Sequence, residues 1–265
     1  MNKLAIFACL VFLSSIAIVI PRETTATETN AYQPETAKLK LIKVVKMVDA
    51  ELNSGNFAEI SSFKNELWGV EFNVHDGWQY VSRINPKTGE VVKRFLAPNK
   101  TANGVSTLGI WGRTAWVIDS DIGSIYRLDT SNGQVKAEYD IGTVITSPRG
   151  GTTDSKGHLW ILDTSLTGRS RVVDFDPAKG MVKKAIELKI DFFGHDIAID
   201  SKGSLYITVD ILFSRNLLLK VDGKKGTLLK KYLLGEYESG VAILGNNLVT
   251  ADPQQGKYRF YRMPK

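Results

Sequence analysis

A turn that recurs at a nearly constant interval constrains the fold of this chain more than any other sequence feature. Four turns begin with Asp or Asn and end with glycine, and their glycines are Gly89, Gly133, Gly180 and Gly226. These glycines follow one another at intervals of 44, 47 and 46 residues. An Asp or Asn side chain caps the start of such a turn, and glycine supplies a positive φ at its end. A repeat of this length indicates an array of similar structural units.

A second motif recurs in phase with these turns. It pairs a small or aliphatic residue with an aromatic one and ends in an acid. The copies are Leu67-Trp68-Gly69-Val70-Glu71, Ala115-Trp116-Val117-Ile118-Asp119, Leu159-Trp160-Ile161-Leu162-Asp163, Leu205-Tyr206-Ile207-Thr208-Val209-Asp210 and a weaker Leu248-Val249-Thr250-Ala251-Asp252. A short apolar segment precedes each copy, so each repeat contains several short strands separated by turns.

The third repeat illustrates the predicted unit. Its four strands are expected at Arg149–Thr153, His158–Asp163, Arg171–Asp176 and Met181–Leu188. Four strands per unit at this period are typical of the blades of a β-propeller.

The fifth repeat has only three strands, at Val241–Leu244, Asn247–Ala251 and Lys257–Arg262. The segment Leu39–Val48 alternates apolar and polar residues and can supply the missing outer strand, which removes an open sheet edge. We therefore predict an all-β propeller of five four-stranded blades, closed by an N-terminal strand. Six blades remain the alternative if residues 70–80 contain further structure.

The N-terminal segment is predicted to lie outside this fold. The apolar run Leu4–Ile20 follows a basic residue and precedes a polar stretch, which is typical of a signal peptide. We assign residues 1–31 to a signal peptide and linker, cleaved near Ala26 or Ala31, and residues 32–265 to a single propeller domain. A secreted or periplasmic protein is expected, with an uncleaved membrane anchor as the alternative. The single cysteine, Cys9, falls in this run, which excludes a disulfide framework.

The charge of the chain is moderate and dispersed. It has 34 Lys and Arg against 28 Asp and Glu, a net charge of +6. The lysines lie mostly at outer turns and outer strands, where they keep sheet edges soluble. We expect no nucleic-acid partner, no membrane contact beyond the leader, and a monomer.

Two segments, Ser147–Leu188 and Gly194–Asp210, resemble the repeats of the NHL, streptogramin lyase-like and gluconolactonase/regucalcin-like propeller superfamily. A weaker similarity links the run Leu159–Thr164 to the yellow/royal-jelly proteins. The resemblance to streptogramin lyases implies a catalytic histidine at His195, although neither His158 nor His75 stands where their second histidine would. The gluconolactonase resemblance implies a divalent cation at the central channel. This chain, however, lacks the Pro-Asn-Gly motif of those enzymes.

The recurring acids are the candidate metal ligands. Glu71, Asp119, Asp163 and Asp252, together with Asp210, all end a second strand and therefore share one face of the ring. Carboxylates near one axis are suitable ligands for Ca²⁺ or Mg²⁺. The alternative is that each one accepts amide hydrogen bonds in its own loop and stabilises its own blade.

The candidate ligand-binding residues also lie on this top face. Arg149 and His195 occupy matching positions in repeats three and four, and differences between similar repeats are where function is placed. Trp78, Arg169 and Arg215 lie in the loops after the second strands and complete a proposed pocket.

Two functions follow as expectations. The first is an exported binding or recognition propeller that takes a small molecule or a protein at its top face and central channel. The second is a metal-dependent, lactonase-like hydrolase or a lyase, with the acids holding a cation and His195 as the base.

Overall fold

The structure is a computed structural model that describes residues 36–48, 57–73, 76–98, 104–142, 144–164, 169–211 and 215–264. The chain divides into two compact units, residues 1–33 and 34–265, and every described residue belongs to the second. The predicted signal peptide with its cleavage points at Ala26 and Ala31, and also His75, lie outside the described residues.

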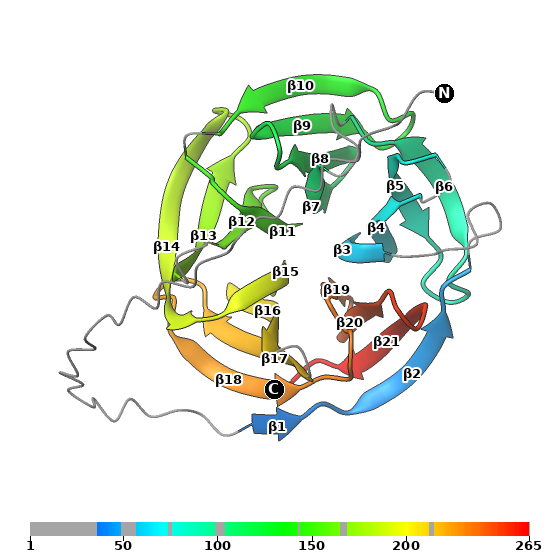
Figure 1. Ribbon diagram of the computed structural model, residues 1–265, viewed down its shortest axis with the longest axis vertical. Coiled ribbons are helices and arrows are strands. Elements are labelled where there is room, and N and C mark those ends of the chain that lie inside the picture. Colours follow the sequence, from blue (N-terminus) through cyan, green and yellow to red (C-terminus); the bar gives the residue numbers. More distant parts are fainter. Residues whose placement is uncertain are drawn as a thin grey trace, which may run out of the picture. The chain divides into compact units, whose positions relative to one another are not determined.

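The second unit is a ring of five β-sheets around a common axis (Figure 1). Every regular secondary-structure element in its described residues is a β-strand. The elements are β1 (Thr36–Lys38), β2 (Leu41–Lys46), β3 (Phe57–Phe63), β4 (Glu66–Phe72), β5 (Gln79–Ile84), β6 (Val91–Leu96), β7 (Val105–Trp111), β8 (Thr114–Asp119), β9 (Ser124–Asp129), β10 (Val135–Asp140), β11 (Pro148–Thr153), β12 (Leu159–Thr164), β13 (Arg169–Asp176), β14 (Met181–Asp191), β15 (Phe193–Ile199), β16 (Ser204–Ile211), β17 (Arg215–Asp222), β18 (Leu228–Leu233), β19 (Gly240–Leu244), β20 (Asn247–Asp252) and β21 (Lys257–Arg262).

Each blade is an antiparallel meander that runs outward from the axis. Blades 1 to 4 are β3–β6, β7–β10, β11–β14 and β15–β18, and blade 5 is β19–β21 with β2 outermost. Strand β2 pairs antiparallel with β21, Leu41 opposite Tyr261 and Lys46 opposite Lys257. The prediction of a five-bladed propeller closed by an N-terminal strand is confirmed, and the six-bladed alternative is wrong.

One strand of the ring was not predicted. The short strand β1 pairs in parallel with β18, Thr36 opposite Lys231, and adds a fifth strand to blade 4. Because β2 belongs to blade 5, the N-terminal segment crosses from one blade to the next (Figure 1).

The core consists of apolar clusters between neighbouring blades. The aromatic residue of the recurring motif is buried in each of the first four repeats: Trp68, Trp116, Trp160 and Tyr206. Each packs with residues of the next blade, as Trp68 does with Val105 and Leu108. The repeated motif therefore solves the same packing problem at each interface, and burial of this apolar surface is the main force that holds the ring together.

The repeated turn glycines make the outer contact between blades. Gly89 has a φ of 78°, and a Cβ there would lie 1.9 Å from the carbonyl oxygen of Lys46 in the adjacent blade. At Gly226, with a φ of 66°, a Cβ would lie 2.1 Å from the carbonyl oxygen of Glu187. A side chain is excluded at both positions by conformation and by space, which explains the feature that dominates the sequence.

One hairpin turn departs from this use of glycine. Lys64, between β3 and β4, has a φ of 56°, whereas the equivalent turns of blades 2 and 5 place Gly112 and Gly245 at φ of 62° and 60°. Glycine is preferred at this first position of a two-residue hairpin, and a left-handed conformation costs other residues about 1–2 kcal/mol. Blade 1 therefore carries local strain at a lysine.

We expect the substitution Lys64→Gly to raise the free energy of unfolding by about 0.5–1 kcal/mol, because relief of strain exceeds the entropy that glycine loses on folding. Chemical denaturation followed by fluorescence measures the difference. The reverse change at the equivalent turn, Gly112→Lys, should lower the free energy by about 1 kcal/mol. A destabilised Lys64→Gly variant would contradict this account.

Candidate functional site

The five innermost strands converge on the axis, and four of them carry a β-bulge close to their first residue. The register with the second strand shifts around Ala58 in β3, Ser106 in β7, Arg149 in β11 and His195 in β15, whereas β19 pairs with β20 without a shift. We call this end of the axis the top mouth, and the end where the innermost strands finish the bottom mouth. Bulges redirect side chains and are common beside functional sites.

The bulges of blades 3 and 4 bring two of the predicted ligand-binding residues together. The guanidinium carbon of Arg149 lies 5.0 Å from the centre of the Phe193 ring. The Phe193 ring also contacts His195, whose ring centre is 5.6 Å away and whose ring plane is inclined at 76°. His195 Nε2 lies 2.9 Å from Asp210 Oδ2. We call Arg149, Phe193, His195 and Asp210 the top-mouth cluster.

The top-mouth cluster is accessible. Arg149 is exposed, Phe193 is 43% exposed, and the side chain of His195 is 26% exposed. Among the described residues Arg149 has no ion pair. The sequence predicted Arg149 and His195 but not Phe193, whose ring joins them.

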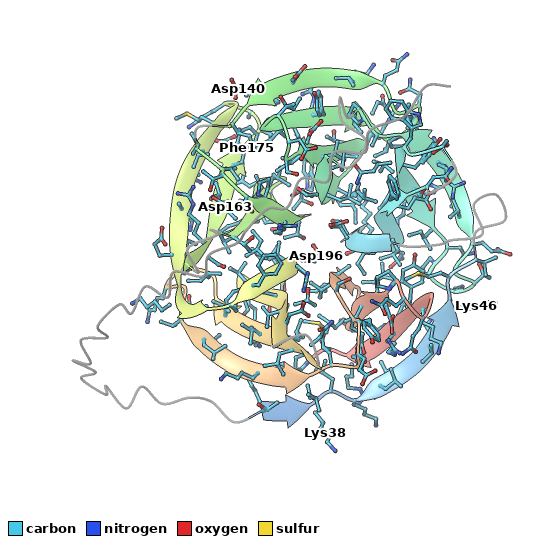
Figure 2. All side chains as sticks on the ribbon, viewed as in Figure 1. Lys38, Lys46, Asp140, Asp163, Phe175 and Asp196 are labelled. Carbon is cyan, nitrogen blue, oxygen red and sulfur yellow. The ribbon has the colours of Figure 1, made fainter. Side chains whose placement is uncertain are left out.

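Two acidic residues lie deeper on the axis than the top-mouth cluster. They are Glu59 in β3 and Asp196 in β15, and each directly follows the bulged residue of its strand. Asp196 is buried near the middle of the ring (Figure 2). Its Oδ2 accepts hydrogen bonds from the backbone N–H groups of Ile60 (3.1 Å) and Val241 (2.8 Å), and its Oδ1 accepts one from Ile197 (2.8 Å). Asp196 thus connects the innermost strands of blades 1, 4 and 5.

Burial gives these axial acids unusual proton affinities. Desolvation raises the pKa of Glu59, on β3, to about 8, against a smaller opposing effect of the Arg149 charge. Desolvation also raises the pKa of Asp196, although its amide hydrogen bonds oppose this shift. Near neutral pH, Glu59 can therefore give or take a proton beside the top-mouth cluster.

The predicted metal ligands each have a partner within their own blade. The ion pairs are Glu71 with Arg94 at 2.6 Å, Asp163 with Arg171 at 2.8 Å, and Asp252 with Arg259 at 2.7 Å. Asp119 accepts the backbone N–H of Asp121 at 3.1 Å. No group of three or more His, Cys, Asp or Glu side chains in the described part of the chain is arranged to hold a metal ion. Partners within each blade agree with the alternative of blade stabilisation, and the shared Ca²⁺ or Mg²⁺ site stays a prediction.

Of the other predicted ligand-binding residues, Trp78 has a described side chain, and it does not join the top-mouth cluster. Trp78 is 44% exposed, and its backbone N–H donates to Asp76 in its own loop at 2.9 Å. Within the described residues, no ring contact joins Trp78 to Phe193 or His195. The side chains of Arg169 and Arg215 lie outside the described ones.

Comparison with known proteins identifies the fold class. The sequence matches no family model and no curated protein. The glutaminyl cyclase of Myxococcus xanthus is similar in structure, with a TM-score of 0.66 at 11% identity, over 87% of this chain and 98% of that one. A chain of a nidogen/laminin complex is similar with a TM-score of 0.50 at 15% identity, over 73% of this chain and 71% of that one. The chain is therefore a β-propeller.

Within the part of the chain that the structure describes, no helix has the length and apolar character needed to cross a membrane.

Proposed function

We propose that this chain is an exported binding propeller whose top mouth recognises a small molecule or protein segment through a carboxylate or similar planar anion. The observation that carries this proposal is the convergence of the bulged residues Arg149 and His195 on the ring of Phe193. The same bulge in blades 1 and 2 holds Ala58 and Ser106. Blades 3 and 4 thus carry an arginine and a histidine at a repeated position where blades 1 and 2 carry an alanine and a serine.

The chemistry of the top-mouth cluster supports an anionic group next to an apolar one. The guanidinium group presents a planar set of donors that matches a carboxylate. Asp210 fixes the orientation of His195 through Nε2, and Phe193 supplies an exposed apolar face. Unlike Arg94, Arg171 and Arg259, which are each paired with an acid, Arg149 keeps its charge available for a ligand.

A titration with benzoate tests the proposal, because benzoate combines a carboxylate with a ring. We expect the chain to bind benzoate measurably by calorimetry and Arg149→Gln to weaken binding about tenfold, the effect of one charge-assisted hydrogen bond. Arg262→Gln, at an exposed arginine of β21, is the control and should leave binding unchanged. Equal weakening by both variants, or no binding of benzoate, acetate or citrate, would exclude the proposal.

A second candidate is an enzyme, a hydrolase or lyase, and the pKa of Glu59 favours it. A carboxyl group that titrates near pH 8 can act as a general acid or base, with His195 as its partner at the mouth. Lactones and a peptide with N-terminal glutamine are the substrates to test, the latter because a glutaminyl cyclase shares the fold. Turnover that Glu59→Gln abolishes would favour the enzyme.

We also propose membership of the NHL and gluconolactonase-like superfamily, export, and a monomeric state. Mass measurement of the protein recovered outside the cytoplasm tests export, since cleavage near Ala26 or Ala31 removes the leader.

A further inference from the structure

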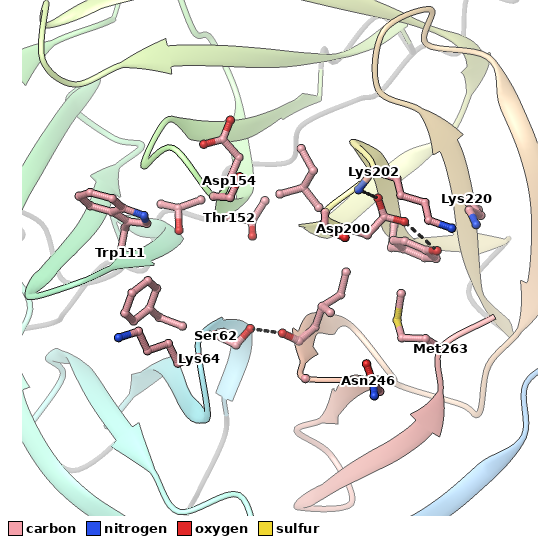
Figure 3. A pocket seen from close by; sticks show the side chains of 18 of the residues that line it. Ser62, Lys64, Trp111, Thr152, Asp154, Asp200, Lys202, Lys220, Asn246 and Met263 are labelled. Carbon is pink, nitrogen blue, oxygen red and sulfur yellow. Dashed lines mark hydrogen bonds between the residues drawn. The ribbon is translucent and has the colours of Figure 1, made fainter. Parts of the chain in front are cut away.

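A cavity of about 620 Å³ occupies the bottom mouth, the end of the axis opposite the top-mouth cluster (Figure 3). Its lining comes from all five blades, and most of it belongs to the ends of the innermost strands and the hairpin turns that follow them. Asp196 lies on the axis between the two mouths, bonded to three of the innermost strands. The bottom cavity is therefore a site of its own.

Three lysines and two aspartates line this cavity, and the carboxylate oxygens of both aspartates already accept hydrogen bonds in their own turns. Asp154 accepts the backbone N–H groups of Lys156 (2.8 Å) and His158 (3.1 Å). Asp200 makes the equivalent bonds in blade 4, accepting the N–H groups of Lys202 and Ser204 at 2.9 and 2.8 Å. These carboxylates hold their own turns together.

The lysines are Lys64, Lys202 and Lys220. None of them has an ion pair among the described residues. Lys64 and Lys220 lie over the rings of Phe63 and Tyr206, each with Nζ 5.4 Å from the ring centre. Three unpaired ammonium groups around one cavity favour an anion within it.

Lys64 adds an independent observation. It holds the left-handed backbone conformation in a turn where blades 2 and 5 place glycine. Neither Gly112 nor Gly245 has an atom within 4 Å of a Cβ position, so crowding does not explain the choice between glycine and lysine. Strain that persists at a site is a reason to look for a function there, and here it places an ammonium group at the cavity rim.

Trp111 gives the cavity a planar apolar wall. Its side chain is 43% exposed, at the end of β7. A Cβ on Gly157 would lie 2.9–3.1 Å from three atoms of the indole, so the backbone of Gly157 lies against the ring and fixes its position. Figure 3 shows Trp111 on the side of the cavity away from Lys202 and Lys220.

We propose that the bottom cavity binds a small molecule that carries a phosphate group on a planar ring. The ammonium groups of Lys202 and Lys220 bind the anionic group, and the indole of Trp111 stacks on the ring. Lys64, which Figure 3 shows on the same side as Trp111, adds positive charge at the rim. This site is separate from the top-mouth cluster and does not depend on the function proposed there.

Calorimetry with phenyl phosphate tests this proposal on the full chain. We expect saturable binding that Lys202→Gln weakens about tenfold and that Trp111→Ala weakens about fivefold. Lys64→Gly should weaken binding about threefold, because it removes positive charge from the rim. Since Lys64→Gly relieves strain, loss of binding in that variant reflects the missing ammonium group rather than misfolding. Lys224→Gln, at an outer turn, is the control and should bind as the unchanged chain does.

Inorganic phosphate and benzyl alcohol separate the two parts of the recognition. We expect each to bind more weakly than phenyl phosphate, because one lacks the ring and the other lacks the charge. Absence of phenyl phosphate binding, or equal weakening by Lys224→Gln, would overturn the proposal. Inorganic phosphate binding as tightly as phenyl phosphate would overturn the role of Trp111.

Discussion

Replacement of Asp196 by alanine is expected to lower the free energy of unfolding by about 4 kcal/mol. The carboxyl group accepts the N–H groups of Ile60, Ile197 and Val241, and all three bonds are buried. A buried donor that loses its acceptor costs about 1–3 kcal/mol, and these donors belong to three different blades. Denaturation at about pH 6, followed by fluorescence and circular dichroism, measures the loss.

Two further substitutions make this prediction specific. Asp196→Asn keeps the shape of the side chain and one carbonyl acceptor. It should therefore lower the free energy of unfolding by about half as much as Asp196→Ala. Asp140→Ala is the matched control, because exposed Asp140 accepts a single N–H, from Gly142 at 3.0 Å, and its loss should cost under about 1 kcal/mol. A change of less than about 1 kcal/mol in Asp196→Ala would show that water replaces the carboxyl group on the axis.

The stability of the ring is expected to fall as the pH rises from about 5 to about 8. Burial raises the pKa of Glu59 from 4.5 to about 8, so the folded protein holds the proton more tightly than the unfolded chain. Stability from this group is complete below the unfolded pKa and is lost as the pH rises through the folded pKa. The full shift corresponds to about 5 kcal/mol. Since the Glu59 side chain is only half-buried, we expect the free energy of unfolding to fall by about 2 kcal/mol across this pH range.

Denaturation curves between pH about 5 and about 8 test this dependence. Glu59→Gln cannot ionise and should reduce the dependence, leaving the slope that Asp196 contributes in the same direction. Glu90→Gln, at an exposed position, should retain the original slope. Stability that rises across this range, or an unchanged slope in Glu59→Gln, would contradict burial as the cause.

Much of the fold could be predicted because each blade repeats its own local signals. The predicted strand Lys257–Arg262 coincides with β21, and the predicted partner from the N-terminal segment is β2. β1 escaped prediction for a physical reason. A three-residue strand that pairs in parallel needs no adjacent turn and shows no alternation, so nothing in Thr36–Lys38 distinguishes it from a linker.

A residue of the candidate sites could be predicted only where it differs from the residues at the same position of the other repeats. Arg149 and His195 differ from their counterparts in other blades, and the structure brings them together at Phe193. Glu59 and Asp196 occupy the same position of matching strands, but a single acid in a short apolar segment resembles a solvent-facing residue. Their proximity depends on ring closure, which joins residues 136 positions apart through the bond from Ile60 to Asp196.

The crossing of the N-terminal segment from blade 4 to blade 5 has a consequence for biosynthesis. β2 completes its blade only with β21, and Leu41 pairs with Tyr261. During translation, β2 leaves the ribosome long before its partner exists, and its exposed Leu41, Ile42 and Val44 remain an unpaired apolar edge meanwhile. Contacts this distant in sequence form slowly. In the nascent chain, β2 therefore needs protection until the last blade emerges from the ribosome.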